Sequence, residues 1–407
     1  MAVFALDALS ARKGDALVLR WGKAASTHLA LIDGGPSTVY DAAVRPHLQK
    51  LAGSDPAGRP LPVVLRLVVV SHVDDDHIQG ILDLTTAIDI AQKTGSEVPA
   101  TILEAWHNAF ADMEFLADFA DQPELQEAIR EVAARPAALL EAPGITPGGA
   151  ATAGTELIAR AVSVTQGREL DRALNSMARV RRNGAFADRG HFVRDGAGVT
   201  VDGLEVTVVA PNTKLLNALR EHWKKERKKA LARQVAKARA GVAALAAAFD
   251  DPSIPNQSSI VLLVKFKGKS MLLTGDARGD HIIDAIEATP GLGKPLHVDV
   301  LKVPHHGSAH SNGPKLFQAV TADHYVISGN GEHGNPHADA LRALFETQRG
   351  RPITVHLTNR PTAGAVKADD VRKAAEAQAV LDAAEADPNV TLRYRKDGDP
   401  AISVELL

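Results

Sequence analysis

One short segment, residues 65–80, restricts the fold more than any other part of the chain. It opens with a β-branched, almost wholly apolar run, Leu65 to Val70, which predicts a strand buried on both faces. Two imidazoles and three carboxylates follow within six positions: His72, Asp74, Asp75, Asp76 and His77. Burying so much charge is costly unless a cation compensates it, and His and Asp are common ligands of divalent metals. The segment therefore predicts a metal site at the end of a buried strand, in preference to a polar loop that contains two histidines by chance.

The bulk properties of the chain are those of a soluble globular protein. Its 407 residues can bury a large core in one domain or two, and 45% of them are hydrophobic and 23% charged. No apolar run reaches the roughly 20 residues that a membrane-spanning helix needs, and the first residues lack the basic start of a signal peptide. We therefore expect a cytoplasmic protein with no membrane partner. The lack of cysteine excludes disulfides, thiolate zinc sites and cysteine nucleophiles, and the net charge of −3 provides no overall attraction to nucleic acid.

Other predicted strands also end in candidate ligands. The strands expected over 28–32, 270–273, 298–303 and 325–328 are each followed by a polar loop. A structural zinc site uses ligands that are close in sequence, whereas these are spread over about 300 residues. These candidate ligands therefore predict a composite catalytic site at one rim of the sheets. Asp33 could also be a turn residue or the partner of a ligand. The candidates are Asp33, Asp276, His305, His306, His333 and His337.

The order of the predicted elements indicates the architecture. A strand, a ligand-rich loop and then a helix recur at 65–90, 270–289, 298–320 and 325–347. This order predicts two mixed sheets packed face to face, with helices on the outside. The last strands, expected over 390–394 and 402–406, are predicted to close the chain as a hairpin.

A long helix is predicted over residues 214–249, and part of it is strongly basic. Residues 220–239 contain nine Lys or Arg and two Glu. Such a run is either a solvated helix face or a contact for the phosphates of a nucleic acid or nucleotide, and both interpretations stay open. The candidate substrate-binding residues are Lys224, Lys225, Arg227, Lys228 and Lys229.

Several motifs taken together resemble the metallo-β-lactamase superfamily. The narrower resemblance is to the metallohydrolase domain of ComEC/Rec2 DNA-uptake channel proteins and to its soluble relatives. It extends over most of the chain except for residues 105–250, which look like an insertion that includes the basic helix. The motifs are Asp33-Gly34-Gly35, His72-x-Asp74-x-Asp76-His77, Thr274-Gly275-Asp276 and the run from Lys302 to Ser308, with Gly14-Asp15-Ala16 and residues 394–404 also fitting the subgroup.

The resemblance implies an αββα sandwich, formed by residues 1–407 as a single domain, with one or two metal ions at the sheet edge. By position, His72 and Asp74 would bind one ion, Asp76 and His77 the other, and Asp276 would bridge the two. Asp74 stands where the superfamily usually has His. This oxygen-rich site favours Mn²⁺ or Mg²⁺ without excluding Zn²⁺.

Two motifs of the superfamily are altered in this chain. No recognisable motif supplies the usual third-motif histidine, for which His107, His191 and His222 are the candidates. The last motif reads Gly334-Asn335-Pro336, so that His333 or His337 would replace the usual ligand.

The expected chemistry is hydrolysis by a metal-activated water. Asp76 or Asp75 would orient the water and accept its proton, and His305 or His306 would stabilise the charge that develops on the substrate. A phosphodiesterase or nuclease is the leading hypothesis. The alternatives are a hydrolase of small esters, lactones or amides, and a non-catalytic binding module, which the Asn335 change motivates. The sequence does not indicate the oligomeric state.

Overall fold

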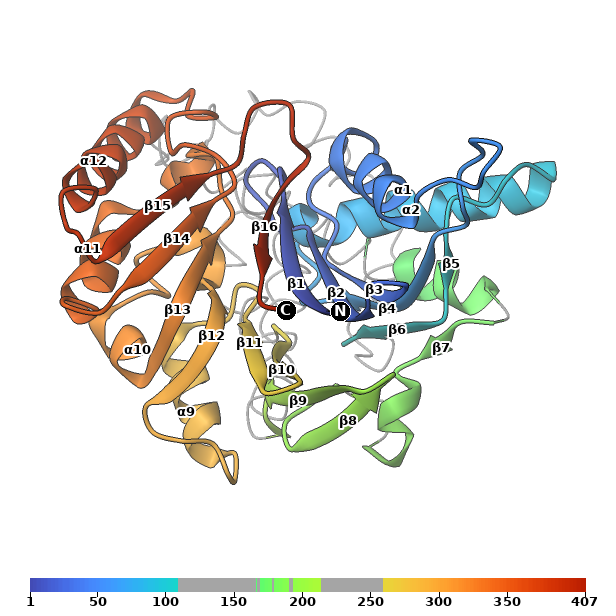
Figure 1. The fold of residues 1–407 in the computed structure, drawn as a ribbon, viewed down its shortest axis with the longest axis horizontal. Coiled ribbons are helices and arrows are strands. Elements are labelled where there is room, and N and C mark those ends of the chain that lie inside the picture. The colour runs from blue at the N-terminus through green and yellow to red at the C-terminus, as the bar shows by residue number, and fades with distance from the viewer. Residues whose placement is uncertain (109–165, 167–168, 178, 190–192, 214–258) are drawn as a thin grey trace, which may run out of the picture.

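A computed structural model describes residues 1–108, 166, 169–177, 179–189, 193–213 and 259–407 of the chain (Figure 1). The first sheet has eight strands in the order β16-β1-β2-β3-β4-β6-β7, with β5 also paired to β4. Strands β3, β4 and β6 run parallel to one another, so that their carboxyl ends share one edge. The strands are β1 (Ala2–Leu9), β2 (Leu17–Lys23), β3 (Ser26–Ile32), β4 (Val64–Val70), β5 (Thr101–Ile102), β6 (Glu104–His107), β7 (Arg181–Arg182) and β16 (Ala401–Glu405).

The second sheet also has eight strands, in the order β15-β14-β13-β12-β11-β10-β9-β8. The strands from β11 to β15 are parallel, and the rest are antiparallel. The strands are β8 (Ala197–Val201), β9 (Leu204–Ala210), β10 (Val261–Phe266), β11 (Lys269–Leu273), β12 (Leu296–Lys302), β13 (Val320–Ile327), β14 (Ile353–Leu357) and β15 (Val390–Tyr394).

Helices cover the outer face of each sheet (Figure 1). The first sheet packs against η1 (Tyr40–Val44), α1 (Arg45–Ala52), α2 (Asp75–Thr94) and the helical residues 169–176, and the second against α9 (Gly279–Ala288), α10 (Pro314–Ala319), α11 (Ala338–Thr347) and α12 (Ala368–Ala384). Short 3₁₀ segments are η4 (Gly184–Arg189), η5 (Pro304–Gly307) and η6 (Glu332–Gly334). None of the helices in the described ranges is long and apolar enough to cross a membrane.

A third core lies between the two sheets. Phe4, Leu6 and Trp106 from the first sheet pack there against Leu262 and Val300 from the second. With one core under each helical layer and one between the sheets, the molecule has the four layers of an αββα sandwich. The predicted fold class is confirmed.

The predicted closing hairpin is wrong. Strand β15 extends the second sheet by parallel pairing with β14, and β16 pairs with β1 of the first sheet, with Ala5 opposite Glu405. The connection between them is held by Arg395, whose guanidinium donates to the carbonyls of Thr358 and Asp399. Two neighbouring strands in sequence thus have different partners, because each covers the open edge of a different sheet.

The segment predicted as an insertion, 105–250, contributes strands to both sheets where it is described. Strand β6 pairs with β4, and β8 and β9 form one end of the second sheet. The basic helix predicted over 214–249, with its five candidate substrate-binding residues, lies outside the described residues, as do His191 and His222.

Candidate metal centre

The candidate ligands meet where strands from both sheets end at one rim. His72 follows β4, Asp276 follows β11, and His305 and His306 follow β12. The two sheets are joined at this rim by a hydrogen bond from the backbone N–H of Ile260 to the carbonyl of Ser71, at 2.9 Å. The ends of β4 and β11 also touch, because a Cβ on Gly275 would lie 2.8 Å from Cβ of Ser71.

Helix α2 begins at Asp75, within the stretch after the strand that the sequence predicted as a ligand-rich loop. Asp74 is its N-cap residue, in an extended conformation, and Asp75 and Asp76 occupy the first turn. Carboxylates are favourable there because the helix dipole is positive at the N-terminus. The early start places Asp74, Asp76 and His77 on one turn facing the rim.

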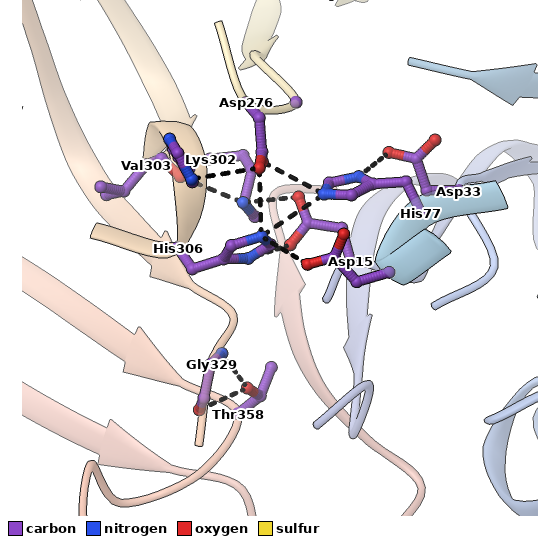
Figure 2. A network of polar contacts seen from close by, with 12 residues as sticks. Asp15, Asp33, His77, Asp276, Lys302, Val303, His306, Gly329 and Thr358 are labelled. Carbon is purple, nitrogen blue, oxygen red and sulfur yellow. Dashed lines mark hydrogen bonds and ion pairs between the residues drawn. The ribbon is translucent and has the colours of Figure 1, made fainter. Parts of the chain in front are cut away.

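Four imidazoles surround the carboxylate of Asp276 (Figure 2 labels two of them). Nε2 of His77 lies 3.2 Å from Oδ1 of Asp276, and Nε2 of His306 lies 3.3 Å from Oδ2. Nε2 of His305 and of His72 are 3.7 Å and 3.9 Å from the same Oδ2. Asp276 therefore occupies the position in which one carboxylate can serve two groups of ligands.

Two carboxylates divide the imidazoles into two donor sets. Oδ2 of Asp74 is 3.6 Å from Nε2 of His72, and Oδ2 of Asp76 is 3.7 Å from Nε2 of His306. The contacts thus form two sets that share Asp276: one with His72 and Asp74, and one with Asp76, His77 and His306, in which the Nε2 atoms of the two imidazoles are 3.4 Å apart. The described contacts of His305 join it to Asp276 and leave its set open. His306, which was expected to stabilise charge on the substrate, is placed here as a metal-ligand candidate.

Two further carboxylates hold the far nitrogens of the imidazoles in the second set. Oδ2 of Asp33 lies 2.8 Å from Nδ1 of His77, and Asp33 also accepts hydrogen bonds from the N–H and Oγ of Ser71. Oδ1 of Asp15 lies 3.2 Å from Nδ1 of His306. A proton on each Nδ1 would leave the lone pair of each Nε2 available to a metal ion, an arrangement that recurs around metal-binding histidines.

Asp15 and Lys302 form a buried ion pair beside the site (Figure 2). Nζ of Lys302 lies 2.7 Å from Oδ2 of Asp15, and neither side chain is more than 1% exposed. Asp15, His77, Asp276 and His306 each offer a donor atom, and these atoms lie within 4.8 Å of one another. Because the oxygens of Asp15 face Lys302 and Nδ1 of His306, we interpret Asp15 as the residue that orients His306 rather than as a ligand.

The charged groups of the cluster shift the pKa values of one another. Burial alone would raise the pKa of Asp276, but His306, His77 and His305 hold it well below its ordinary value. Burial likewise disfavours the charged form of His306, but Asp276 and Asp15 raise its pKa to about 9. The pKa of His305 is lowered, mainly by burial. His77 and His306, whose pKa values are both raised, thus balance the negative charge of Asp276.

A divalent cation fits this arrangement. The imidazole Nε2 of His72 and Oδ1 of Asp276 are buried and make no hydrogen bond of normal geometry within the described residues. The cluster also brings together the carboxylates of Asp15, Asp33, Asp74, Asp76 and Asp276, and among the described residues a lysine pairs with Asp15 alone of these five. Mixed imidazole and carboxylate donors are those that Zn²⁺ and Mn²⁺ accept.

Other predicted site residues lie elsewhere. The carboxylate of Asp75 accepts a hydrogen bond from Gln166 at 2.9 Å, on the outer side of α2. Nδ1 of His337 accepts from the backbone N–H of Ala309, and His333 is exposed on η6. Neither His333 nor His337 forms a hydrogen bond or ion pair with Asp276 in the described part of the chain.

His107, a candidate for the third-motif ligand, is buried in β6. Burial lowers its pKa to about 4. Its backbone is paired with the side chain of Asn183, and its ring makes no hydrogen bond to any described residue. The structure therefore places no ring contact between His107 and the described ligand cluster.

Asp15 and Lys302 were not predicted as site residues. Lys13-Gly14-Asp15 has the composition of a turn between two strands, and Lys302 was read only as part of a motif. The available signal was a lysine at the end of an apolar strand, since a buried lysine needs a carboxylate partner.

Known proteins resemble this chain over a short segment of sequence or at low structural similarity. No family model matches the chain. A segment of 96 residues is 34% identical to ComE operon protein 3 of Bacillus subtilis (strain 168), covering 23% of this chain and 12% of that protein. The chain thus spans a small part of this curated relative.

Two solved structures align along most of the chain. The metallo-β-lactamase fold protein YhfI from Bacillus subtilis aligns over 99% of this chain and 100% of its own, with 12% identity and a TM-score of 0.37. MEM-A1, a subclass B3 metallo-β-lactamase from a soil metagenome library, aligns over 94% of each chain, with 14% identity and a TM-score of 0.28. At these TM-scores the alignments carry no argument about this chain's activity.

Proposed function

We propose that this chain is a metal-dependent hydrolase that cleaves phosphodiester bonds, using Mn²⁺ or Zn²⁺. The observation that carries the proposal is the convergence of two donor sets on the buried carboxylate of Asp276. When bound, divalent ions at such a site stabilise charge on phosphoryl oxygens and make water a stronger nucleophile at neutral pH. A site with two halves suits phosphodiesters, since the attacking and the leaving oxygen both need stabilisation.

Other residues of the chain would position the metal ligands and accept a proton from water. Asp33 and Asp15 hold His77 and His306 in place, and Lys302 holds Asp15. The side chain of Asp76 is 25% exposed, so this carboxylate can meet a substrate and accept a proton from water. We assign this role to Asp76 rather than to Asp75, because Asp75 is bonded to Gln166.

The assignment to the ComEC-like group of the metallo-β-lactamase superfamily is part of the proposal. It is supported by the four layers, by the motifs that now meet at one rim, and by the similarity of 96 residues to ComE operon protein 3. Asp74, in place of histidine, favours Mn²⁺ over Zn²⁺ because it adds an oxygen donor. Binding of nucleic acid by the basic helix and a cytoplasmic location remain predictions.

The test is a double substitution in the second donor set. We expect Asp76→Ala with His77→Ala to remove most of the bound metal, measured by elemental analysis, and to abolish hydrolysis of bis(4-nitrophenyl) phosphate in Mn²⁺ and in Zn²⁺. The matched control is His297→Ala with Asp323→Ala, an exposed histidine–aspartate pair whose nearest N and O atoms are 3.6 Å apart. Unchanged metal content and activity in the first variant would reject the site.

A substrate panel separates the proposed function from its alternatives. Wild-type protein should cleave single-stranded DNA, RNA, a cyclic dinucleotide or the chromogenic diester faster than a lactone. Cleavage of the lactone alone would favour a small-molecule hydrolase, and bound metal with no cleavage would favour a binding module.

A further inference from the structure

The backbone that carries two of the candidate ligands has a strained conformation. His305 (φ 48°, ψ 49°), His306 (φ 53°, ψ 21°) and Gly307 (φ 81°) are consecutive, and these three residues form a left-handed segment. Residues other than glycine rarely adopt this conformation, because their Cβ comes close to the following carbonyl oxygen. Such strain persists only where the surrounding structure enforces it. The contacts that enforce it therefore determine where both imidazoles lie.

One of these contacts comes from the side chain of Asn312, which is 1% exposed. Its Nδ2 donates to the carbonyl of Pro304 at 2.7 Å and to the carbonyl of Ser308 at 2.8 Å. These two carbonyls flank the left-handed segment, and each takes one of the two amide hydrogens. A single buried amide therefore links the start of the segment to its end.

A second restraint comes from His337, the N-cap residue of α11. Its backbone N–H donates to the carbonyl of Gly307 at 3.0 Å, and its ring Nδ1 accepts from the backbone N–H of Ala309 at 3.0 Å. From the end of β11, the carbonyl of Gly275 accepts from the backbone N–H of His305 at 3.1 Å. The left-handed segment is therefore fastened to an outer helix as well as to a neighbouring strand.

We infer that Asn312 and the ring of His337 are positioning residues of the metal centre. By keeping residues 305–307 left-handed, they hold both imidazoles of that segment beside Asp276 before a metal ion binds. The inference rests on the proposed function, and it assigns two residues that act through the metal ligands. Without these restraints the segment would relax toward the backbone conformations that histidine prefers, and its imidazoles would leave the carboxylate.

The first test compares two variants that each lose a buried side-chain amide. Asn312→Leu removes the link across the left-handed segment. The matched control is Gln348→Met, because Gln348 is 3% exposed and its Nε2 donates to the carbonyl of Phe317 at 2.7 Å, at the opposite end of α11. Both variants should be less stable than the wild type, but we expect only Asn312→Leu to bind Mn²⁺ about tenfold more weakly in titration calorimetry of the folded protein. Equal Mn²⁺ affinities in the two variants would overturn the role of Asn312.

The second test separates positioning from metal ligation at His337. In His337→Asn the amide oxygen is bonded to Cγ, as Nδ1 is, so it still accepts from the N–H of Ala309, whereas His337→Leu has no acceptor. We expect the asparagine variant to bind Mn²⁺ within about twofold of the wild type and the leucine variant about tenfold more weakly. An equal loss in both variants would make the ring a ligand, and no loss in either would make it dispensable. Both of these results contradict the positioning role.

Hydrogen exchange of the metal-free protein separates failure of this inference from failure of the proposed function. Peptides that span residues 303–312 should exchange faster in Asn312→Leu than in Gln348→Met, because the restraint acts on the backbone itself. If the wild-type protein binds no Mn²⁺, the proposed function fails, and the exchange rates still test the restraint. Equal protection of these peptides in the two variants would contradict it.

Discussion

At the scale of single residues, two lysine–aspartate ion pairs of equal length contribute differently to the stability of the protein. Lys302 and Lys269 each lie 2.7 Å from an aspartate, Asp15 and Asp299 respectively. The first pair is fully buried beside the metal centre, whereas the side chain of Lys269 is 40% exposed. Water screens the exposed pair, while the buried one has no substitute for its partner.

We expect Lys302→Met to lower the free energy of unfolding of the metal-free protein by about 3–5 kcal/mol, because the buried carboxylate of Asp15 then loses the ammonium group that pairs with it. Lys269→Met should cost less than about 1 kcal/mol. Urea denaturation of both variants checks this. Similar losses in the two variants would show that burial of the Lys302 pair does not matter.

At the scale of elements, two glycines decide how α2 meets β3. The backbone N–H of Gly34 donates to the carbonyl of His77 at 2.7 Å, and Gly80 donates to the carbonyl of Gly35 at 2.9 Å. A Cβ on Gly80 would collide with the backbone of Gly34. This close approach lets Asp33, at the end of β3, reach the imidazole of His77 on α2.

Gly80→Ala should therefore separate α2 from β3. We expect a loss of about 1–3 kcal/mol in stability and weaker metal binding, measured by denaturation and by titration calorimetry. Gly313→Ala is the control, since a Cβ there meets no atom within 4 Å. A variant at Gly80 that is as stable as the control would contradict the packing argument.

Strand β14 carries a histidine that makes the fold sensitive to acid. His356 is buried and lies 3.2 Å from His324 on β13, and burial, followed by His324 and Arg393, lowers its pKa to about 3. The unfolded chain binds this proton near pH 6.5, whereas the folded chain does not until about pH 3. Stability is therefore lost as the pH falls through this window.

His356→Gln should remove about 1.4 kcal/mol of this acid sensitivity for each pH unit between 6 and 4. Thermal unfolding across that range, with the exposed His297→Gln as reference, measures the difference. If the two variants lose stability in parallel as the pH falls, His356 is not the source.

At the scale of the whole molecule, the last strand joins the two halves. The chain leaves the second sheet after β15, crosses to the first and adds β16 to the edge of β1. Val404 of β16 is buried in the core between the sheets. The strand therefore both protects an edge and closes the central core.

Deleting residues 400–407 should expose the edge of β1 and make the protein aggregate, which light scattering would detect. Inserting two glycines after the exposed Gly398 lengthens the crossing without removing a pairing, and this variant should remain monodisperse. A soluble, cooperatively unfolding deletion variant would show that β16 is dispensable.

The local sequence determined most of the elements and most of the candidate ligands. The strand at 390–394 was predicted with the bounds it has, and most candidate ligands were found where an apolar run stops. These features are readable because periodicity and strand ends are properties of a few neighbouring residues. The start of α2 was missed because its acidic first turn also looks like a loop.

Only the tertiary structure decided which partners these elements take. The separation of β15 from β16, the pairing of Lys302 with Asp15, and the turning of Asp75 toward Gln166 all depend on contacts between distant residues. The pairing of His72 with Asp74 and of His306 with Asp76 around Asp276 also depends on such contacts. Sequence spacing cannot supply these contacts, since they follow from how two sheets and their rims pack together.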